Sequence, residues 1–259
     1  MSVTVVQLED RIFVAERPLT AVMTVKAALI LDERYAVVVD TLQAPADMGP
    51  FRALIAGHGR PVIVVNTHAH WDHVWGNGAF PNALIIAHDR CREEMLTALP
   101  AELERKQNEQ REVFDAVRIV PPAVTFSHTL CIHAGELTVV LHHLPGHTPD
   151  SCVAHIPERR LLLAGDCAEA PIPAGMAGLS LAAWARALRT WAQEVQTVVP
   201  AHGPVSGPDL LEANAAYLEG LLTDPDRPWH SDDPFYQETH QANVAIARAE
   251  RIGFPDPSA

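Results

Sequence analysis

The sequence predicts an α/β fold in which two packed β-sheets carry helices on their outer faces. Short apolar runs bounded by turn residues occur in two groups along the chain, and segments with helical spacing follow each group. This order is typical of two sheets that bury one face against each other and the other face under helices. The 259 residues, 48% of them hydrophobic, are enough to bury a sizeable core.

The first group of predicted strands lies at residues 4–8, 11–15, 26–31, 36–40, 62–66 and 83–87. Residues 32–35 are predicted to connect two of these strands as a hairpin. Residues 46–56 have helical spacing and stop near Gly57 and Gly59. A long helical segment at about 89–117, broken at Pro100, follows the last strand as an insertion.

The second group of predicted strands lies at residues 123–126, 130–133, 137–143, 152–156, 161–164 and 198–199. Helices are expected at 180–195 and 209–222, and again at 235–251 after a Pro-rich segment. We therefore expect a main domain at residues 1–223 that contains the helical insertion. A C-terminal Pro-rich and helical extension at 224–259 is expected to pack on the same domain.

Charge and composition exclude several classes of function. The formal net charge is −13 and no basic stripe occurs, which argues against a nucleic-acid partner. Residues 1–10 lack a secretory signal, and no apolar run approaches the roughly 18 residues that cross a membrane. The four cysteines form no CxxC pair, as expected for a reducing cytoplasm. These features predict a cytoplasmic protein without a nucleic-acid or membrane partner, and they do not specify its oligomeric state.

Five histidines and two aspartates stand at spacings that suit a metal centre. The densest group is His68-x-His70-x-Asp72-His73 in the segment 67–73, directly after the apolar run 61–66. A regular strand would place His68, His70 and Asp72 on one face, whereas a loop can turn Asp72 and His73 toward a second point. Imidazole and carboxylate are ligands that suit zinc, iron or manganese. One short segment can therefore supply two metal ions, and a non-functional histidine-rich loop is disfavoured.

The remaining motifs complete a resemblance to the metallo-β-lactamase superfamily, in which HxHxDH is the signature. They are Asp40 in 37–41, His147 in 145–151, Asp166 in 163–167 and His202 in 200–204. The resemblance covers at least residues 25–205. It implies an αβ/βα four-layer sandwich of two mixed β-sheets with helices on the outside and metals at the sheet edges.

The resemblance also implies the ligands of two divalent ions, with zinc favoured and iron or manganese fitting nearly as well. The first ion would be held by His68, His70 and His147, the second by Asp72, His73 and His202, and Asp166 would bridge both. Hydroxide between the ions would be the nucleophile, and Asp72 would also be the catalytic residue that accepts its proton. Asp40 would fix a ligand or its loop, the alternative being a simple turn residue. The best-known zinc β-lactamases have a Cys where this chain has Asp166, and we expect Cys167 to be a packing residue.

The ligand set predicts attack by hydroxide on a carbonyl, phosphoryl or similar centre, and it does not specify the leaving group. The resemblance implies a small-molecule substrate, for which we expect the carbonyl of a lactam, lactone, ester or thioester. Two alternatives remain open. One is a mononuclear iron persulfide dioxygenase of the same superfamily, with His68, His147 and Asp166 as its ligands. The other is a non-catalytic metal-binding protein. We expect the insertion at 89–117 to lie over the active-site cleft, and Trp71 and Trp75 to be either core residues or the lining of an apolar cleft.

Overall fold

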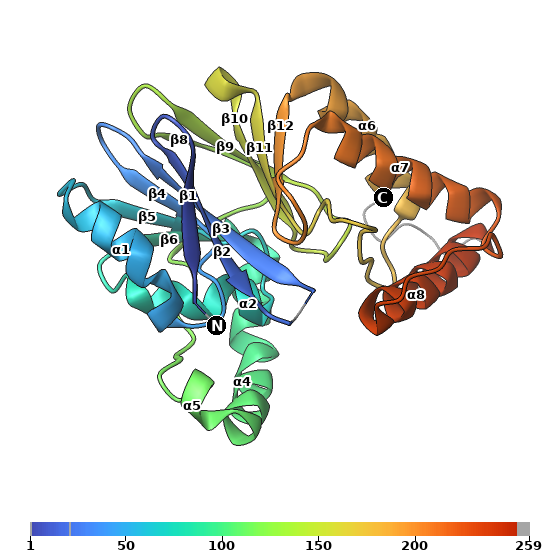
Figure 1. Cartoon of the computed structure of the whole chain (residues 1–259), viewed down its shortest axis with the longest axis horizontal. Coiled ribbons are helices and arrows are strands. Elements are labelled where there is room, and N and C mark those ends of the chain that lie inside the picture. The colour runs from blue at the N-terminus through green and yellow to red at the C-terminus, as the bar shows by residue number, and fades with distance from the viewer. Residues whose placement is uncertain (1, 21, 253–259) are drawn as a thin grey trace.

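Two mixed β-sheets pack face to face in the computed structural model, which describes residues 2–20 and 22–252 (Figure 1). The first sheet has seven strands in chain order: β1 (Thr4–Glu9), β2 (Ile12–Pro18), β3 (Thr24–Leu31), β4 (Ala36–Val39), β5 (Val62–Val65), β6 (Leu84–His88) and β7 (Val124–Phe126). Strands β1 to β4 pair antiparallel, and β4 to β7 pair parallel.

The second sheet has five strands in the order β12-β11-β10-β9-β8. They are β8 (Thr129–His133), β9 (Thr138–His143), β10 (Cys152–Ile156), β11 (Leu161–Gly165) and β12 (Thr197–Pro200). Only β11 and β12 of this sheet are parallel. The predicted α/β class with two mixed sheets is confirmed.

Alternation of side chains along the central strands explains the four layers. In β4, Val37 and Val39 face the core between the two sheets, while Ala36 and Val38 face the core under helix α1 (Gly49–Ala56). Strand β11 divides in the same way, with alternate residues directed toward the other sheet and toward the helices on the outside. These strands are apolar on both faces because both faces are covered.

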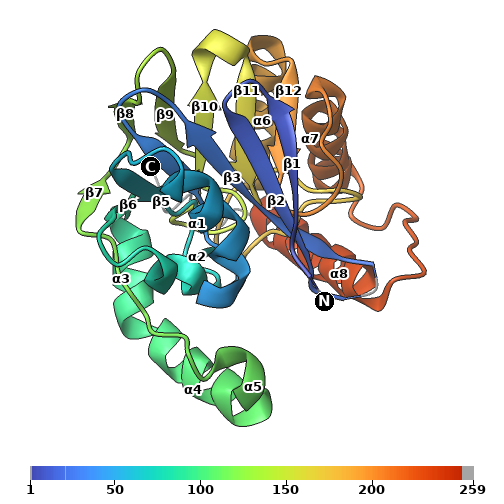
Figure 2. The same cartoon turned by 60° about the vertical axis from the view of Figure 1, so that its left-hand side comes forward.

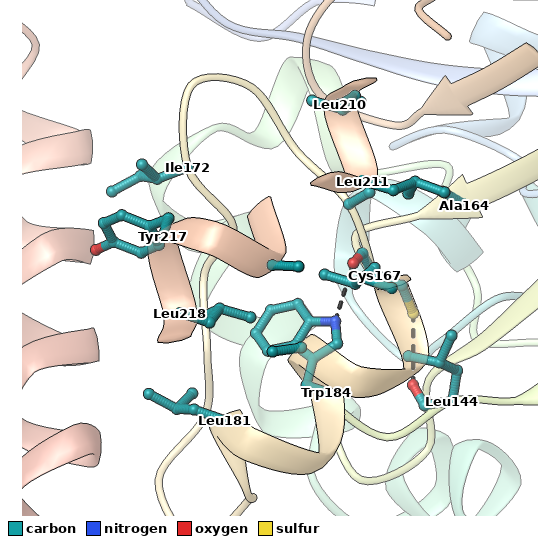
Figure 3. Close-up of a cluster of buried hydrophobic side chains, with 14 of the residues drawn as sticks. Leu144, Ala164, Cys167, Ile172, Leu181, Trp184, Leu210, Leu211, Tyr217 and Leu218 are labelled. Carbon is teal, nitrogen blue, oxygen red and sulfur yellow. Dashed lines mark hydrogen bonds between the residues drawn. The ribbon is translucent and has the colours of Figure 1, made fainter. Parts of the chain in front are cut away.

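Helices α6 (Leu181–Glu194), α7 (Pro208–Thr223) and α8 (Pro234–Arg251) lie on the side of the five-stranded sheet (Figures 1 and 2). Trp184 of α6 is buried in their core, and its indole N–H donates to the carbonyl of Cys167 at 3.0 Å (Figure 3). The Cys167 thiol in turn donates to the carbonyl of Leu144 at 3.5 Å. Cys167 is therefore a packing residue, as the sequence predicts. Residues 253–259 of the expected C-terminal extension lie outside the described residues.

The helical insertion forms three helices: α3 (Asp89–Thr97), α4 (Leu99–Glu109) and α5 (Arg111–Phe114). The break lies at Ala98 instead of Pro100, because a proline in the first turn of α4 needs no N–H and does not interrupt the helix. Helices α4 and α5 extend away from the sheets (Figure 2). Four short pieces were not expected from the sequence as separate elements: α2 (Trp71–Val74) and the 3₁₀ turns at Pro45–Met48, Trp75–Ala79 and Pro157–Arg159. No described helix is both long and apolar enough to span a bilayer.

Candidate metal centre

The structure brings the seven predicted ligands together in two adjacent groups. The first group is His68, His70, His147 and Asp166, and the second is Asp72, His73 and His202. Within each group, one potential ligand atom per residue lies within 4.8 Å of all the others. The membership of the groups is the same as in the sequence-based assignment, with Asp166 counted in the first.

The ends of parallel strands explain why distant segments converge here. His68 follows the carboxyl end of β5, Asp166 follows β11, and His202 follows β12. His147 comes from the loop between β9 and β10, at the same edge. The one-turn helix α2 separates the HxHxDH segment into its two parts, since His70 precedes the helix and Asp72 and His73 lie within it.

Asp166 lies between the two groups. Its Oδ2 is 3.5 Å from His68 Nε2 and 3.4 Å from His147 Nε2, on the side of the first group. Its Oδ1 is 3.2 Å from His73 Nε2, and its Oδ2 is 3.5 Å from His202 Nε2, on the side of the second. A carboxylate in this position can contact ions in both groups.

Hydrogen bonds on the far side of the rings fix three of the histidines. Nδ1 of His147 lies 2.6 Å from the Ala174 carbonyl, and Nδ1 of His202 lies 2.7 Å from the Thr24 carbonyl. Since a carbonyl only accepts, each Nδ1 must carry a proton, so it is Nε2 that has the lone pair whenever the ring is neutral. His73 Nδ1 contacts Asp40 Oδ2 at 2.8 Å. Such contacts orient histidines that bind metals.

Asp40 also holds the loop that carries the first ligands. Its Oδ1 accepts a hydrogen bond from the backbone N–H of Thr67, and its Oδ2 accepts one from the Thr67 hydroxyl, both at 2.8 Å. Asp40 is 3% exposed and has a φ of 61°, a left-handed conformation for which aspartate is better suited than most residues. The structure therefore places Asp40 behind His73 and Thr67, outside both ligand groups.

Polar atoms without partners indicate that the site is built for cations. Among the residues the structure describes, His68 Nε2, His73 Nε2 and Asp166 Oδ1 are buried and have no hydrogen-bond partner. Buried polar atoms are normally paired, because an unpaired one loses its hydration without replacement. His68 Nε2 lies 3.5 Å from Asp166 Oδ2, and His73 Nε2 lies 3.2 Å from Asp166 Oδ1, so these atoms converge on one carboxylate and the residues present fit a pair of divalent ions.

The electrostatic environment differs between the two groups. Burial, together with the neighbouring imidazoles, holds the pKa of His68 well below its usual range and lowers the pKa of His70 to about 4. Burial also opposes protonation of His73 and His202, but the carboxylates of Asp166 and its neighbours outweigh it. They raise the pKa of His202 to about 10 and that of His73 well above its usual value. Without metal, the first group is rich in neutral imidazole and the second holds imidazolium.

Two acidic residues at the site were not assigned a role from the sequence, although Asp150 lies in the segment 145–151 around His147. Glu169 is 1% exposed, its Oε1 has no partner among the described residues, and burial is the main reason why its pKa is raised to about 8. Asp150 Oδ2 accepts the backbone N–H of Ala69 at 2.8 Å and so fixes the loop between His68 and His70. The fold buries Glu169 beside the motif residues, and the local sequence around Glu169 does not predict that burial.

A cavity of about 390 Å³ opens beside His70. Its walls are formed by α3, the first turn of α4, the loop 148–150 and Met176. The insertion therefore lines a cavity at the candidate site, but only through its first half. Trp75 is fully buried in the core with Phe114, and Lys106 Nζ lies 3.9 Å from the centre of the Trp71 ring. Neither tryptophan lines the cavity.

Comparisons with known proteins agree with this fold. The sequence model of the metallo-β-lactamase superfamily matches residues 21–211. No curated protein sequence is significantly similar to the chain. A metallo-β-lactamase from Pontibacter korlensis superposes with a TM-score of 0.64 at 21% identity, over 84% of this chain and 99% of that one. The mono-zinc form of the metallo-β-lactamase FIM-1 from Pseudomonas aeruginosa gives 0.64 at 18% identity, over 85% and 96%.

A double mutant of the sec-alkyl sulfatase PisA1 superposes with a TM-score of 0.68 at 14% identity. That match covers 98% of this chain and 51% of the sulfatase, so it includes most of α8. At these identities the solved structures show the fold alone. The match to the superfamily model extends over well more than half of the chain, and it includes all eight predicted site residues. The chain belongs to the metallo-β-lactamase superfamily.

Proposed function

We propose that the chain is a dinuclear metal-dependent hydrolase that attacks a carbonyl of a small-molecule lactam, lactone, ester or thioester. The position of Asp166 carries this proposal, because its carboxylate faces histidines of both groups within 3.2 to 3.5 Å. The complete second group supports it as well, since a mononuclear enzyme does not need Asp72, His73 and His202. Zinc is favoured because histidines dominate, although iron or manganese would also suit these ligands.

Each residue of the site has a proposed role. His68, His70 and His147 would hold one ion, and Asp72, His73 and His202 the other. When bound, the two ions would activate a water molecule and polarise the carbonyl of the substrate. Asp72 Oδ2, which lies 3.6 Å from His202 Nε2, would accept the proton of the attacking water. Asp40 would keep His73 oriented, and the cavity beside His70 would receive the substrate.

The charge of the cavity wall favours substrates without additional negative groups. Four acidic residues and one basic residue line it: Glu93, Glu94, Glu102, Asp150 and Arg90. The net charge of −13 makes a nucleic-acid substrate unfavourable as well. The cysteines among the described residues are free, in agreement with a reducing compartment such as the cytoplasm.

A test is to replace Asp166 by Asn and to measure metal content together with turnover of a panel of esters, thioesters, lactones, lactams and alkyl sulfates. We expect occupancy to fall from about two ions per chain and turnover to fall with it. Asp115→Asn makes the same chemical change at an exposed position of the insertion and should alter neither. Unchanged occupancy and turnover in Asp166→Asn would overturn the bridging role.

The second candidate is a mononuclear iron dioxygenase that acts on persulfides. His68, His147 and Asp166 lie together as two imidazoles and one carboxylate, a set that also suits non-haem iron. About one iron per chain, with oxygen uptake in the presence of glutathione persulfide, would favour this candidate. Two zinc or manganese ions and no oxygen uptake would favour the hydrolase, and metal without any turnover would favour a non-catalytic metal-binding protein.

A further inference from the structure

We propose that Asn243 of helix α8 is a positioning residue that holds the Ala174 carbonyl against His147 and thereby sets the orientation of a ligand in the first group. This inference rests on the proposed metal centre. It assigns part of the geometry of that centre to the C-terminal helix, which contributes no predicted ligand. The observations that carry it are the contacts of Asn243 and Glu250 of α8 with the loop that follows Asp166, and the contact of that loop with His147.

The loop that carries Ala174 has no regular structure of its own. Residues 167–180 connect β11 to α6 without a helix or strand, and the carbonyl of Ala174 lies 2.6 Å from Nδ1 of His147. A loop of this length depends on side-chain contacts to hold any one carbonyl in place. The orientation of His147 therefore depends on whatever fixes the backbone at Ala174.

Asn243 forms hydrogen bonds with the two residues that flank Ala174, and these two bonds are called the clasp below. Its Nδ2 donates to the Pro173 carbonyl at 2.7 Å, and its Oδ1 accepts the backbone N–H of Gly175 at 2.9 Å. The amide is fully buried and uses both ends, so its orientation is determined by its partners. A Cβ added to Gly175 would lie 3.0 Å from Asn243 Oδ1, which shows how closely the loop approaches the helix.

Helix α8 is anchored independently of this clasp. Tyr236, Ile246 and Ala247 are buried in the core that contains α6 and α7. At its other end, the Glu250 carboxylate accepts hydrogen bonds from the Ser180 hydroxyl at 2.6 Å and from the backbone N–H of Leu181 at 2.7 Å. Removing the Asn243 amide therefore releases the loop at one point and leaves the helix in place.

The clasp lies beside the support of one group of ligands. His147 belongs to the first group, whereas the rings of His202 and His73 in the second are held by Thr24 of β3 and by Asp40 directly after β4. The loop's own contact with the second group, from the Ala170 N–H to the His202 carbonyl at 3.3 Å, lies four residues before Ala174. When the Ala174 carbonyl is free to move, the His147 ring loses its fixed tautomer and direction, and the second group keeps its own supports. A role limited to general stability would not distinguish between the two groups.

The test is a zinc titration of the metal-free protein against a chromophoric chelator, with wild type, Asn243→Leu and Tyr217→Phe. In Asn243→Leu, which keeps the volume and loses the hydrogen bonds to Pro173, Gly175 and Tyr217, we expect one binding step to weaken about 10- to 100-fold and the other to change less than about threefold. The bond from Asn243 Nδ2 to the Tyr217 hydroxyl, at 3.3 Å, is not part of the clasp, and Tyr217→Phe removes this bond alone from Asn243. Tyr217→Phe should therefore leave both steps unchanged.

A second variant keeps the proposal testable if Asn243→Leu does not fold. Gly175→Ala places a methyl group against the Asn243 amide and so disturbs the clasp from the side of the loop. It should weaken the same single binding step. Two unchanged steps, or equal weakening of both, in whichever variant folds would overturn the proposal. Wild type that binds no zinc would instead refute the metal centre itself, so the two failures are distinguishable.

Discussion

Asp40 Oδ2 lies 2.8 Å from Nδ1 of His73, a contact between residues 33 positions apart that joins the end of β4 to the metal-binding segment. The same carboxylate holds Thr67, which precedes His68. The buried Asp40 side chain thus supports both ligand groups, through His73 in the second and through the residue before His68 in the first. Its removal should affect the metal ions without removing any ligand.

We expect Asp40→Asn to weaken zinc binding about 10- to 100-fold, mainly at the second group, because His73 loses the partner that orients its ring. Zinc competition with a chelator measures this effect. Asp32→Asn is a matched control, since Asp32 is a buried carboxylate that accepts hydrogen bonds from Arg11 and the Leu137 N–H outside the site. Both variants should lose stability, and an equal zinc affinity in both would refute the role of Asp40.

Zinc binding should release protons from the second group. The pKa of His202 is raised to about 10 and that of His73 is also raised, so both rings are protonated at pH 7 in the metal-free protein and must lose a proton to bind. Affinity should then increase about tenfold per pH unit for each displaced proton. Calorimetry in buffers of different ionisation enthalpy counts these protons, and a titration without proton release would contradict the expectation.

The same shifts predict how the metal-free protein responds to alkali. A histidine whose pKa is higher in the folded than in the unfolded state stabilises the fold fully below about pH 6.5, the ordinary value. That contribution is lost as the pH rises toward the pKa of the histidine in the folded state, which is about 10 for His202. Urea unfolding at pH 6.5 and pH 9.5 should therefore show lower stability at pH 9.5. Stability that rises across this interval would contradict the assignment.

Cys167 should be dispensable for metal binding. Its thiol is buried against the Leu144 carbonyl, and burial raises its pKa so that it stays protonated. We expect Cys167→Ala to lower the free energy of unfolding by about 1–2 kcal/mol through lost packing and to leave the zinc content unchanged. Loss of one zinc ion with no change in stability would show that the thiol is a ligand.

The acidic cavity wall should set the charge preference of the proposed hydrolase. Glu94 and Glu102 line the cavity, and removal of both charges by Glu94→Gln and Glu102→Gln should lower the preference for cationic over anionic esters. We expect the ratio of kcat/KM values to fall about two- to fivefold per charge, the range for partly exposed ion pairs. Glu104→Gln, an exposed residue of α4 outside the cavity wall, should have no effect.

Much of the fold could be predicted from local patterns. Strands such as β10 and β11 are short apolar runs between turn residues, and α6 has an apolar face that includes Trp184 and Leu188. The order of strands within each sheet was not predictable, because pairing depends on contacts between distant segments. Helix α2 was missed because a single turn is too short to show a helical period.

The candidate ligands were predictable for a different reason, since they lie in short motifs at the ends of strands. The residues that support them lack this signal. Asn243 is 68 residues from Gly175, and Glu169 is 45 residues from Asn214, whose side chain binds its backbone. An asparagine in a helix and a glutamate in a loop are ordinary on a surface. Only the packing of α7 and α8 makes these two residues buried neighbours of the site.

Elemental analysis of protein purified without chelators or added metal distinguishes a dinuclear from a mononuclear centre. We expect about two zinc or manganese ions per chain, and fewer in Asp166→Asn. A single iron per chain that remains when His202 is replaced by Ala would contradict the dinuclear hydrolase and support the mononuclear dioxygenase.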